Sequence, residues 1–475
     1  MSTAGHLIEH APDAILAPSA LEDDAEVARI PVDLVVVGGG MAGMACAAHA
    51  AQLGRSVVVL ETGPAIGGSA RISGGYVWTA PDHETMERED PGGDPDLARQ
   101  LVDGWAPGIE WIRELGIRPT DPIEGILGYG RGVNIDMEQF FARCAAVVES
   151  HGGHVVTDID GLSLVTDGGR VRGVRATRGG EAAWWEAPWV ALCTGGFQAD
   201  RELVRDLINP TDAPWLLRSN PHSSGAGIRL GVAAGGALDE RTLSGFYGHL
   251  FPSPLTSIEE KDFVLLAQFH SERGVLLDRA GRRFVDESIG DHVNNQEVLA
   301  RPDGVAYLVI DEHVRRTWVL QSYVPGLDVG VDKMALAADH GCRYAQVDSL
   351  TELAETLTGW GVDGAAARAT VEAYNDALAE GATIDPPRWR HATALTEPPY
   401  SVIEVMPGVT FTYGGLRTDT SCRVLDADGA PVPGLLAAGA DMGGVFERGY
   451  AGGLARGLVF GLAAARTVAE QVPGP

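Results

Sequence analysis

Three glycines and one acidic residue near the start of the chain have the types and spacing of a dinucleotide-binding site. An apolar segment, 34–37, leads into Gly38-x-Gly40-x-x-Gly43, and a second apolar segment, 57–60, ends on Glu61. Glycines at these positions permit, in turn, a tight turn, the approach of backbone N–H groups to a pyrophosphate and close packing of the next helix. The N-terminus of that helix favours phosphate charge.

The Glu61 carboxylate can accept hydrogen bonds from the hydroxyls of an adenosine ribose, whereas a 2′-phosphate would meet its negative charge. The sequence therefore predicts FAD or NAD rather than NADP. The strand, turn, helix and second strand all occur in the expected order and spacing, so the evidence for a dinucleotide site is much stronger than a lone glycine pattern would give. Met41 and Ala42 complete the predicted phosphate-binding turn.

Further glycine-rich segments favour a flavin over a nicotinamide. A simple NAD dehydrogenase would continue from the second strand into a helix, but here a run of small residues follows at 67–75, where a ribityl chain and an isoalloxazine ring can lie. Near the C-terminus, a strand at 434–438 precedes a helix that begins near Gly452-Gly453, whose free N–H groups can stabilise negative charge on a reduced flavin. The additional cofactor-binding candidates are Gly67, Gly68, Ser69, Ser73, Gly74, Gly75, Thr194, Gly195, Gly439, Asp441, Gly452 and Leu454.

Five segments in a fixed order resemble the FAD-dependent fumarate reductase/succinate dehydrogenase flavoprotein superfamily, whose soluble single-chain members include 3-ketosteroid dehydrogenases and related ketone desaturases. The segments are VVVGGGMAGMACAAHA, GGSARISGG, ALCTGGF, ERGVLLDRAGRRFVDE and PGLLAAGADMGG. The resemblance covers about residues 33–470. It implies an α/β fold, in which a discontinuous Rossmann-like FAD-binding domain carries an inserted α+β capping domain and the substrate is held between them.

The expected organisation is a tail at 1–30, an FAD-binding domain at 31–242 and 406–475, and a capping domain at 243–405. The sequence predicts helices at 94–118, 135–152, 349–359 and 364–380, and a strand at 188–193. It also predicts a meander of short strands with a turn at Asp167-Gly168-Gly169.

Fumarate-reducing members of the superfamily use a histidine and an arginine to clamp the substrate carboxylates, and a cap arginine as proton donor. The segment 410–415 of this chain lacks that histidine, Tyr450 stands where the clamp arginine is expected, and 286–292 lacks the acid arginine. Asp291 and His292 are expected on a solvated face. The resemblance therefore favours ketone dehydrogenation over fumarate reduction.

In 3-ketosteroid dehydrogenases a tyrosine and a backbone N–H polarise the ketone, a second tyrosine removes the α-proton, and a hydride passes from the β-carbon to the flavin. The resemblance implies the first role for Tyr450, with the N–H of Gly453. Chemically, an enolate needs donors on its oxygen and a base of suitable pKa. The other catalytic candidates are Tyr413, Tyr247, Tyr76 and His249, although a structural role for His249 is favoured.

Two alternatives to this FAD-dependent dehydrogenase of a cyclic or steroid-like ketone stay open. One is a reductase or dehydrogenase of an unsaturated or polycarboxylic acid, with Arg448 as an anchor. The other is a flavin-carrying electron-transfer subunit. The first prediction requires a small-molecule substrate and an external electron acceptor such as a quinone, a dye or oxygen. No histidine is convincing as a covalent attachment site, so FAD is expected to be non-covalent.

Composition limits the class further. The 475 residues are 45% hydrophobic and 21% charged, which predicts a globular chain of two domains, and the net charge of −29 argues against nucleic acid and anionic membranes. The five widely spaced cysteines show no metal-binding spacing and suit a reducing cytoplasm. No signal-peptide pattern opens the chain, and the apolar stretch 457–465 is too short to span a bilayer, so we expect a cytoplasmic protein without a bound metal.

Overall fold

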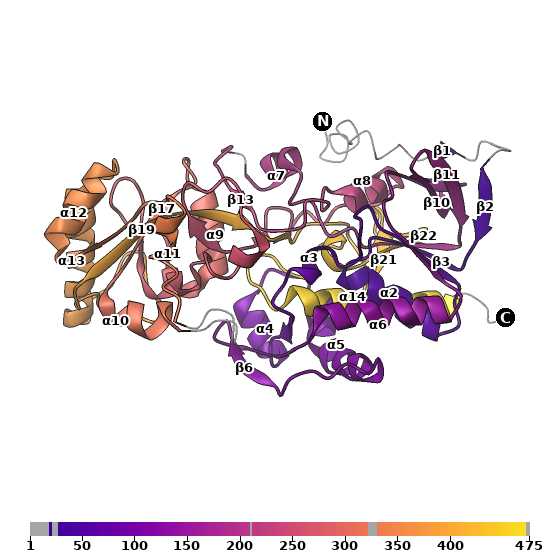
Figure 1. Ribbon diagram of the computed structural model, residues 1–475, viewed down its shortest axis with the longest axis horizontal. Helices are drawn as coiled ribbons and strands as arrows, with labels where there is room; N and C mark the ends of the chain where they lie inside the picture. Colours follow the sequence, from indigo (N-terminus) through magenta and orange to yellow (C-terminus); the bar gives the residue numbers. More distant parts are fainter. Residues whose placement is uncertain (1–18, 21–26, 210, 322–329, 472–475) are drawn as a thin grey trace. The chain divides into compact units, whose positions relative to one another are not determined.

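The computed structural model describes residues 19–20, 27–209, 211–321 and 330–471 (Figure 1). The chain divides into two compact units: unit 1 comprises 1–208, 219–246 and 411–475, and unit 2 comprises 209–218 and 247–410. Most of the predicted tail at 1–30 lies outside the described residues. The domain limits at 243 and 405 stay a prediction; the separate segment 209–218 in unit 2 was not anticipated.

The main sheet of unit 1 has six strands, five of them parallel. Their order is β21 (Arg423–Leu425), β22 (Pro431–Ala437), β12 (Trp189–Leu192), β3 (Leu34–Val37), β4 (Val57–Leu60) and β8 (His154–Val156), with β21 antiparallel to β22. The central strands consist of Val, Leu and Ala, with Trp189 at the start of β12, and are buried at every position, as expected for a parallel sheet covered on both faces. The predicted α/β class is confirmed.

The helices α2 (Met41–Gln52) and α14 (Gly453–Gln471) pack closely in unit 1 (Figure 1). A Cβ on Gly457 would lie 3.0 Å from Met41 Cγ, and one on Gly461 would lie 2.4 Å from the Ala42 carbonyl oxygen. Glycine at both positions therefore allows this approach. Helices α5 (Pro95–Glu114) and α6 (Met137–Ser150) confirm two predicted helices, and Asp94 and Asp136 cap their first turns.

The predicted meander is confirmed as β9 (Gly161–Asp167), β10 (Arg170–Arg178) and β11 (Glu181–Glu186), flanked by β1 (Ser19–Ala20) and β2 (Ala28–Pro31). Gly168 and Gly169 form the turn with φ of 57° and 77°. A three-stranded sheet contains β5 (Tyr76–Thr79), β7 (Gly130–Asn134) and β6 (Ile123–Ile126). The other elements of unit 1 are α3 (Gly68–Arg71), α4 (His83–Glu89), α7 (Arg201–Leu207), α8 (Ala226–Ala233), β20 (Phe411–Thr412) and the 3₁₀ helix η5 (Gly439–Asp441).

Unit 2 is built on a sheet ordered β13 (Leu216–Leu217), β19 (Tyr400–Val409), β17 (Ala306–Ile310) and β16 (Val275–Leu277). Strands β15 (Leu250–Pro252) and β18 (Tyr344–Val347) also pair with β19. The core joins these strands to the predicted and now confirmed helices α12 (Leu350–Gly359) and α13 (Gly364–Glu380). Short elements complete the described chain: β14 (Phe246–Tyr247), η1 (Glu260–Asp262), η2 (Phe269–Arg273), η3 (Glu287–Ile289), α9 (Asp291–Leu299), α10 (Glu312–Val314), η4 (Arg315–Val319) and α11 (Leu336–Asp339).

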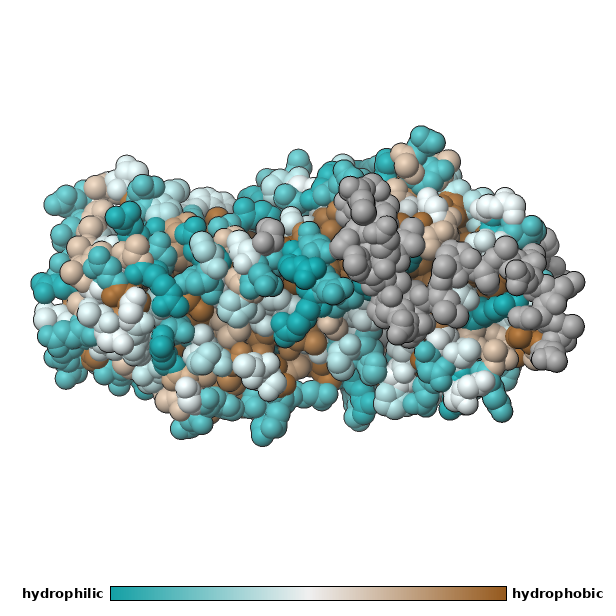
Figure 2. Space-filling view, turned by 90° about the horizontal axis from the view of Figure 1, so that it is seen from above, coloured by the Kyte–Doolittle hydropathy of each residue, from teal (hydrophilic) through white to brown (hydrophobic). Residues whose placement is uncertain are grey.

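The face seen in Figure 2 is mostly hydrophilic, in keeping with the strongly acidic composition. Within the ranges given above, no helix combines the length and hydropathy that a membrane span requires.

Candidate active site

The predicted cofactor residues gather because their segments follow neighbouring parallel strands. Strands β22, β12, β3 and β4 are adjacent, and their carboxyl ends lead into residues 438–441, 193–196, 38–43 and Glu61. In open parallel sheets, ligands bind at this edge. Four motifs scattered over the sequence are thereby placed at one edge of unit 1.

The first glycine turn is sterically obligatory. Gly38 has a φ of 102°, and a Cβ there would lie 2.3 Å from the Cys193 carbonyl oxygen. A Cβ on Gly43 would lie 1.9 Å from the Gly38 carbonyl oxygen. The turn between β3 and α2 can therefore pack this closely only if both positions are glycine.

Gly40, in contrast, borders open space. Gly67 O, at 3.9 Å, is the only atom of the described residues within 4 Å of a Cβ built on Gly40. Gly40 is also the N-cap of α2; no side chain caps this helix and no acidic residue stands in its first turn. Free N–H groups and the positive end of a helix dipole beside open space suit a pyrophosphate.

The Glu61 carboxylate is buried and held in place by backbone donors. It accepts hydrogen bonds from Gly39 N and Gly63 N, both at 2.7 Å, and the side chain is 6% exposed. Each oxygen keeps a further lone pair for a ribose hydroxyl. The structure thus orients Glu61 beside the glycine turn, where the ribose of a dinucleotide is expected.

Substitution of Glu61 tests this placement. We expect Glu61→Ala to weaken FAD retention by about 1.5–3 kcal/mol, the range for hydrogen bonds to a charged group. The measurement is the dissociation constant of FAD from refilled apoprotein. Glu149→Ala, which removes an exposed carboxylate at the end of α6, is the control. Equal FAD affinity in the two variants would contradict a ribose-binding role.

The second glycine-rich run docks against the first. Gly67 N donates to Gly39 O at 2.9 Å, and Ser69 Oγ lies 2.8 Å from Ser219 Oγ. Residues 68–71 of this run form the helical turn α3; Gly67, its N-cap, has a φ of 127°, and the Gly67 carbonyl accepts from Ala70 N. The Ser73 hydroxyl donates to Ala70 O and accepts from Gly75 N. Its hydrogen bonds are therefore made within the glycine-rich run, which also contains Gly74.

Asp441 organises the turn after β12. Its buried carboxylate accepts from Thr194 N, from Thr194 Oγ1 at 3.0 Å and from Gly196 N at 3.1 Å. Burial raises the pKa of this carboxyl, while the hydrogen bonds from Thr194 and Gly196 oppose the rise. Gly195 and Gly439 both need positive φ, at 95° and 68°. Asp441 thus shapes the backbone at the strand edge, and a direct contact with a cofactor stays a proposal for this residue.

Gln198 and Ser219 were missed by sequence reasoning. Gln198 Nε2 donates to Ser219 Oγ at 3.0 Å, and Ser219 Oγ is also within hydrogen-bond distance of Ser69 Oγ. Gln198 Oε1 is buried, and no described residue donates to it, so it offers an acceptor to a bound molecule. The open space beside Gly40 and the unpaired acceptor of Gln198 are both consistent with a cofactor bound at the carboxyl edge of the sheet. No local motif marks either residue.

Tyr450 lies at the centre of an aromatic cluster in unit 1. Its ring centroid is 5.2 Å from Trp78, 5.8 Å from Phe411 and 5.8 Å from Phe446. Gly453 N, at the start of α14, donates to the Tyr450 hydroxyl at 2.9 Å. The predicted pairing of this tyrosine with the N–H of Gly453 is therefore present in the geometry.

The other glycine of the pair also has a steric role. Gly452 has a φ of 95°, and a Cβ there would lie 1.8 Å from Trp78 O. Leu454, a predicted cofactor residue, stands in the first turn of α14 and is half-buried. Tyr76 begins β5, two residues before Trp78. The aromatic cluster is thus fixed by β5 on one side and by the start of α14 on the other.

Arg456 directly precedes the apolar stretch 457–465 and is buried in unit 1, which the sequence did not reveal. Its side chain is 1% exposed, and Nη2 donates to the carbonyls of Met442 and Tyr413. Burial lowers the pKa of the guanidinium to about 10. Tyr413, itself fully buried, packs on Phe446 at 5.4 Å. A cation thus lies directly beneath the aromatic cluster.

The remaining candidates, Tyr247 and His249, belong to unit 2. The Tyr247 hydroxyl lies 2.9 Å from His249 Nε2, and His249 Nδ1 contacts Asp291 Oδ2. The expectation that Asp291 and His292 are solvated is wrong: they are 4% and 5% exposed. Both residues begin α9, which packs against β19 and β15 and buries them. Their polar side chains gave no sign of this burial in the sequence.

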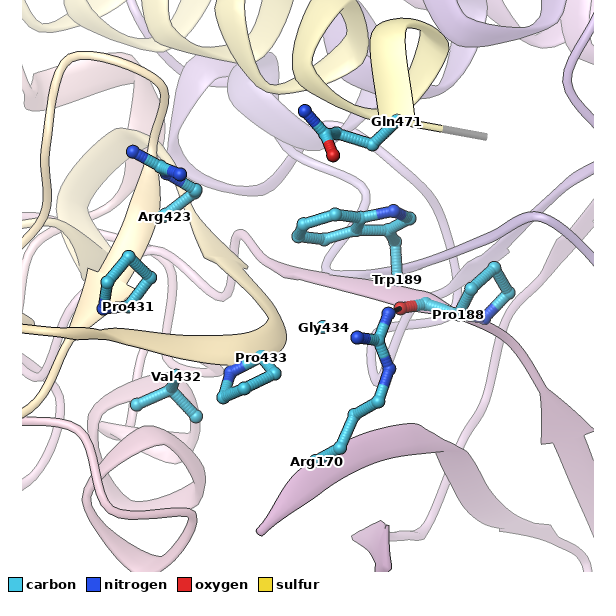
Figure 3. A pocket seen from close by; sticks show the side chains of 9 residues that line it. All are labelled: Arg170, Pro188, Trp189, Arg423, Pro431, Val432, Pro433, Gly434 and Gln471. Atoms are coloured by element: carbon cyan, nitrogen blue, oxygen red, sulfur yellow. Dashed lines mark hydrogen bonds between the residues drawn. The ribbon is translucent and has the colours of Figure 1, made fainter. Parts of the chain in front are cut away.

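A surface hollow of about 550 Å³ lies elsewhere in unit 1, lined by Arg170, Trp189, Arg423 and Gln471 among others (Figure 3). Trp189 begins β12 and Pro431 begins β22, so the hollow is at the amino ends of the strands. It is therefore at the edge opposite the cofactor residues.

Among the described residues, no group of three or more His, Cys, Asp or Glu side chains is arranged so that it could hold a metal ion. All five cysteines are buried and unpaired in disulfides. Burial raises the pKa of the Cys342 thiol to about 11, and raises the pKa values of Cys46, Cys144, Cys193 and Cys422 as well. They are inert packing residues.

Comparison with known proteins identifies the class. The chain matches the family described as "FAD binding domain" over residues 33–107 and 127–454. It is 30% identical over 477 residues to the fumarate reductase (cytochrome) of Shewanella frigidimarina, covering 93% of this chain and 77% of that protein. It is 26% identical to 4-oxocyclohexanecarboxylate 2-dehydrogenase of Sinomonas cyclohexanicum, covering 94% of each.

The fold agrees with a solved structure. The 3-ketosteroid-Δ4-(5α)-dehydrogenase from Rhodococcus jostii RHA1 superposes with a TM-score of 0.77 at 23% identity, covering 96% of this chain and 100% of that one. The protein therefore belongs to the FAD-binding family and to the fumarate reductase/succinate dehydrogenase flavoprotein superfamily. It is an FAD-dependent oxidoreductase that acts on CH–CH groups.

Proposed function

We propose that this enzyme dehydrogenates a cyclic or steroid-like ketone, introducing a C=C bond next to the carbonyl. The observation that carries the proposal is the meeting of the Tyr450 hydroxyl and the Gly453 N–H at 2.9 Å. The Gly453 N–H donates to the Tyr450 hydroxyl oxygen, so the two groups lie side by side. Both can donate to a carbonyl oxygen that comes between them and stabilise the negative charge that develops on it. A substrate carbonyl would take the place of the contact that the two groups make with each other.

The surroundings of Tyr450 favour an apolar ring over a dicarboxylate. Phe411, Phe446 and Trp78 line the tyrosine, and aromatic faces bind apolar rings well. The buried Arg456 guanidinium adds positive charge beneath this cluster, within 5.6 Å of the Phe446 ring. Such a charge stabilises an enolate without contacting the substrate.

The reaction divides the work between cofactor and protein. FAD would be bound by Gly38, Gly40, Gly43 and Glu61 at the strand edge described above, and would supply a hydride acceptor. The chain's own groups hold the carbonyl, exclude water and remove the α-proton. The electron pair of the α-C–H bond forms the new double bond as the β-hydride leaves, and an external quinone, dye or oxygen then takes the electrons.

A second candidate is reduction of an unsaturated acid, since the 30% identical relative is a fumarate reductase. The position of Tyr450 and the absence of a histidine at 410–415 weigh against it. Arg448, whose backbone N–H is held by Asp90 together with those of Glu447 and Gly449, is the available carboxylate anchor in this alternative.

Anaerobic mixing separates the two candidates. Oxidised holoenzyme is mixed with 4-oxocyclohexanecarboxylate or 4-androstene-3,17-dione, and dithionite-reduced holoenzyme with fumarate. We expect a ketone to bleach the flavin, and a quinone or dye to restore its colour without NAD(P). Rapid oxidation of the reduced enzyme by fumarate, with no bleaching by any ketone, would show that the second candidate is correct.

A further inference from the structure

The loop that leads into Tyr450 is held by a single carboxylate of unit 1. This loop lies between η5 and α14 and belongs to neither a helix nor a strand. Asp90 Oδ1 accepts hydrogen bonds from Arg448 N at 3.1 Å and from Gly449 N at 3.0 Å. Asp90 Oδ2 accepts a third from Glu447 N at 3.0 Å. Three successive N–H groups directly before Tyr450 therefore converge on one side chain.

Burial makes Asp90 and the loop depend on each other. Asp90 is 4% exposed, and a buried carboxylate is costly unless hydrogen bonds replace its water shell. Burial raises the pKa of this carboxyl, the three backbone N–H groups oppose the rise, and the charge of Glu447 adds to it. A shift of the loop would leave the buried carboxylate without its donors, so the loop is held at one position.

The connection between α4 and α5, which contains Asp90, also packs closely on the loop. A Cβ on Gly449 would lie 2.3 Å from Glu89 O, so only glycine fits where the loop passes the end of α4. Asp94 N donates to Gly444 O at 2.6 Å. Backbone contacts on both sides of Asp90 therefore support the loop that its carboxylate holds.

Tyr450 needs this support more than its partner Gly453 does. Gly453 is the first residue of α14, and the helix fixes its N–H. Tyr450 stands in the irregular loop, and the backbone that Asp90 holds ends one residue before it. A displacement of about 1 Å at a reacting group can cost about 10²-fold in rate, so the position of this backbone decides how well the Tyr450 hydroxyl can donate.

We propose that Asp90 is a positioning residue for Tyr450: its carboxylate fixes the backbone of 447–449 and thereby places the Tyr450 hydroxyl where a substrate carbonyl can accept from it. This inference rests on the proposed dehydrogenation, and every group in it belongs to unit 1. Because Asp90 acts through the loop, its loss should lower kcat rather than raise KM.

A double-mutant cycle on anaerobic holoenzyme tests this role. Flavin bleaching by 4-oxocyclohexanecarboxylate is measured for wild type, Asp90→Ala, Tyr450→Phe and the double variant, and saturation kinetics separate kcat from KM. FAD content and melting temperature verify folding. Asp90→Asn, which keeps one acceptor oxygen, replaces Asp90→Ala in the cycle if the alanine variant does not fold.

Asp426→Asn is the matched control. The Asp426 carboxylate also accepts two backbone hydrogen bonds, from Asp428 N at 3.0 Å and from Ala430 N at 2.8 Å. It holds the turn between β21 and β22, which does not lead into Tyr450. This substitution removes the same kind of contact from another loop of unit 1.

We expect Asp90→Ala to lower kcat by about 10²-fold and Asp90→Asn by about tenfold, the range for a misplaced reacting group, with KM little changed. In the Tyr450→Phe background the same substitutions should cost less than about twofold, because the hydroxyl that Asp90 positions is already gone. Asp426→Asn should keep the kcat of wild type.

Equal losses with and without the Tyr450 hydroxyl, or an unchanged kcat in the Asp90 variants, would overturn the positioning role, while bleaching of wild type by the ketone upheld the proposed function. If wild type instead turns over only an unsaturated acid, the proposed function fails. The same cycle is then measured with that acid: non-additive losses uphold the role of Asp90, and additive losses overturn it.

Discussion

Tyr450→Phe is expected to lower ketone-dependent turnover by at least about 10²-fold, the effect of removing one oxyanion donor. Phenylalanine keeps the ring that packs on Trp78, Phe411 and Phe446 and deletes only the hydroxyl that meets Gly453 N. The fold and the bound FAD should therefore survive. Stopped-flow bleaching of the flavin by a ketone measures the effect directly.

The control for this variant lies in the same cluster. Tyr129→Phe removes a hydroxyl that donates to the Tyr450 carbonyl oxygen but leaves the Tyr450 hydroxyl in place, so turnover should remain near wild type. If Tyr450→Phe retains full turnover with intact flavin, carbonyl polarisation must pass to Tyr413 or Tyr76. If it loses flavin together with stability, Tyr450 is a packing residue.

Gly43→Ala is expected to abolish FAD retention and to destabilise the fold by about 2 kcal/mol or more, because overpacking alone costs about 1–3 kcal/mol. Helix propensity taken alone would favour alanine over glycine by about 1 kcal/mol. The steric effect outweighs it, since the added Cβ would lie 1.9 Å from the Gly38 carbonyl oxygen, a backbone atom that cannot rotate away. Thermal unfolding and flavin absorbance measure both losses.

Gly359→Ala is the matched substitution without the clash. Gly359 is the last residue of α12, and a Cβ there meets no atom of the described chain within 4 Å. This variant should be neutral or slightly stabilised. If Gly43→Ala behaved in the same way and kept its FAD, the close passage of α2 over the first turn would not be required for cofactor binding.

The sequence predicted the parts of this site whose signals are local. Gly38, Gly40, Gly43 and Glu61 are recognisable because a parallel sheet needs buried apolar strands, and a phosphate-binding turn needs small residues between them. Tyr450 and Gly453 were found through the resemblance to 3-ketosteroid dehydrogenases, in which a tyrosine stands just before the glycines that open the flavin-facing helix. The order of the strands in the main sheet then brings the segments that follow them to its carboxyl edge, and no additional sequence motif is needed for this.

What the sequence did not predict depends on contacts between distant residues. Asp291 lies 42 positions from His249, and nothing in the polar pair Asp291-His292 reveals that it is buried. In the sequence Arg456 simply precedes an apolar stretch. In the structure it is buried inside unit 1, where the carbonyls of Met442 and Tyr413 accept its hydrogen bonds. Burial of a charge is decided by tertiary partners, and periodicity carries no information about them.

The most direct test of the central claim is a single-turnover experiment on anaerobic holoenzyme with a cyclic ketone. Flavin bleaching is followed by absorbance, and the quenched product is identified by mass spectrometry and NMR. Dehydrogenation next to the carbonyl predicts one molecule of α,β-unsaturated ketone for each flavin reduced. A flavin that stays oxidised with every ketone, while the reduced enzyme converts an unsaturated dicarboxylate to its saturated form, would contradict the account.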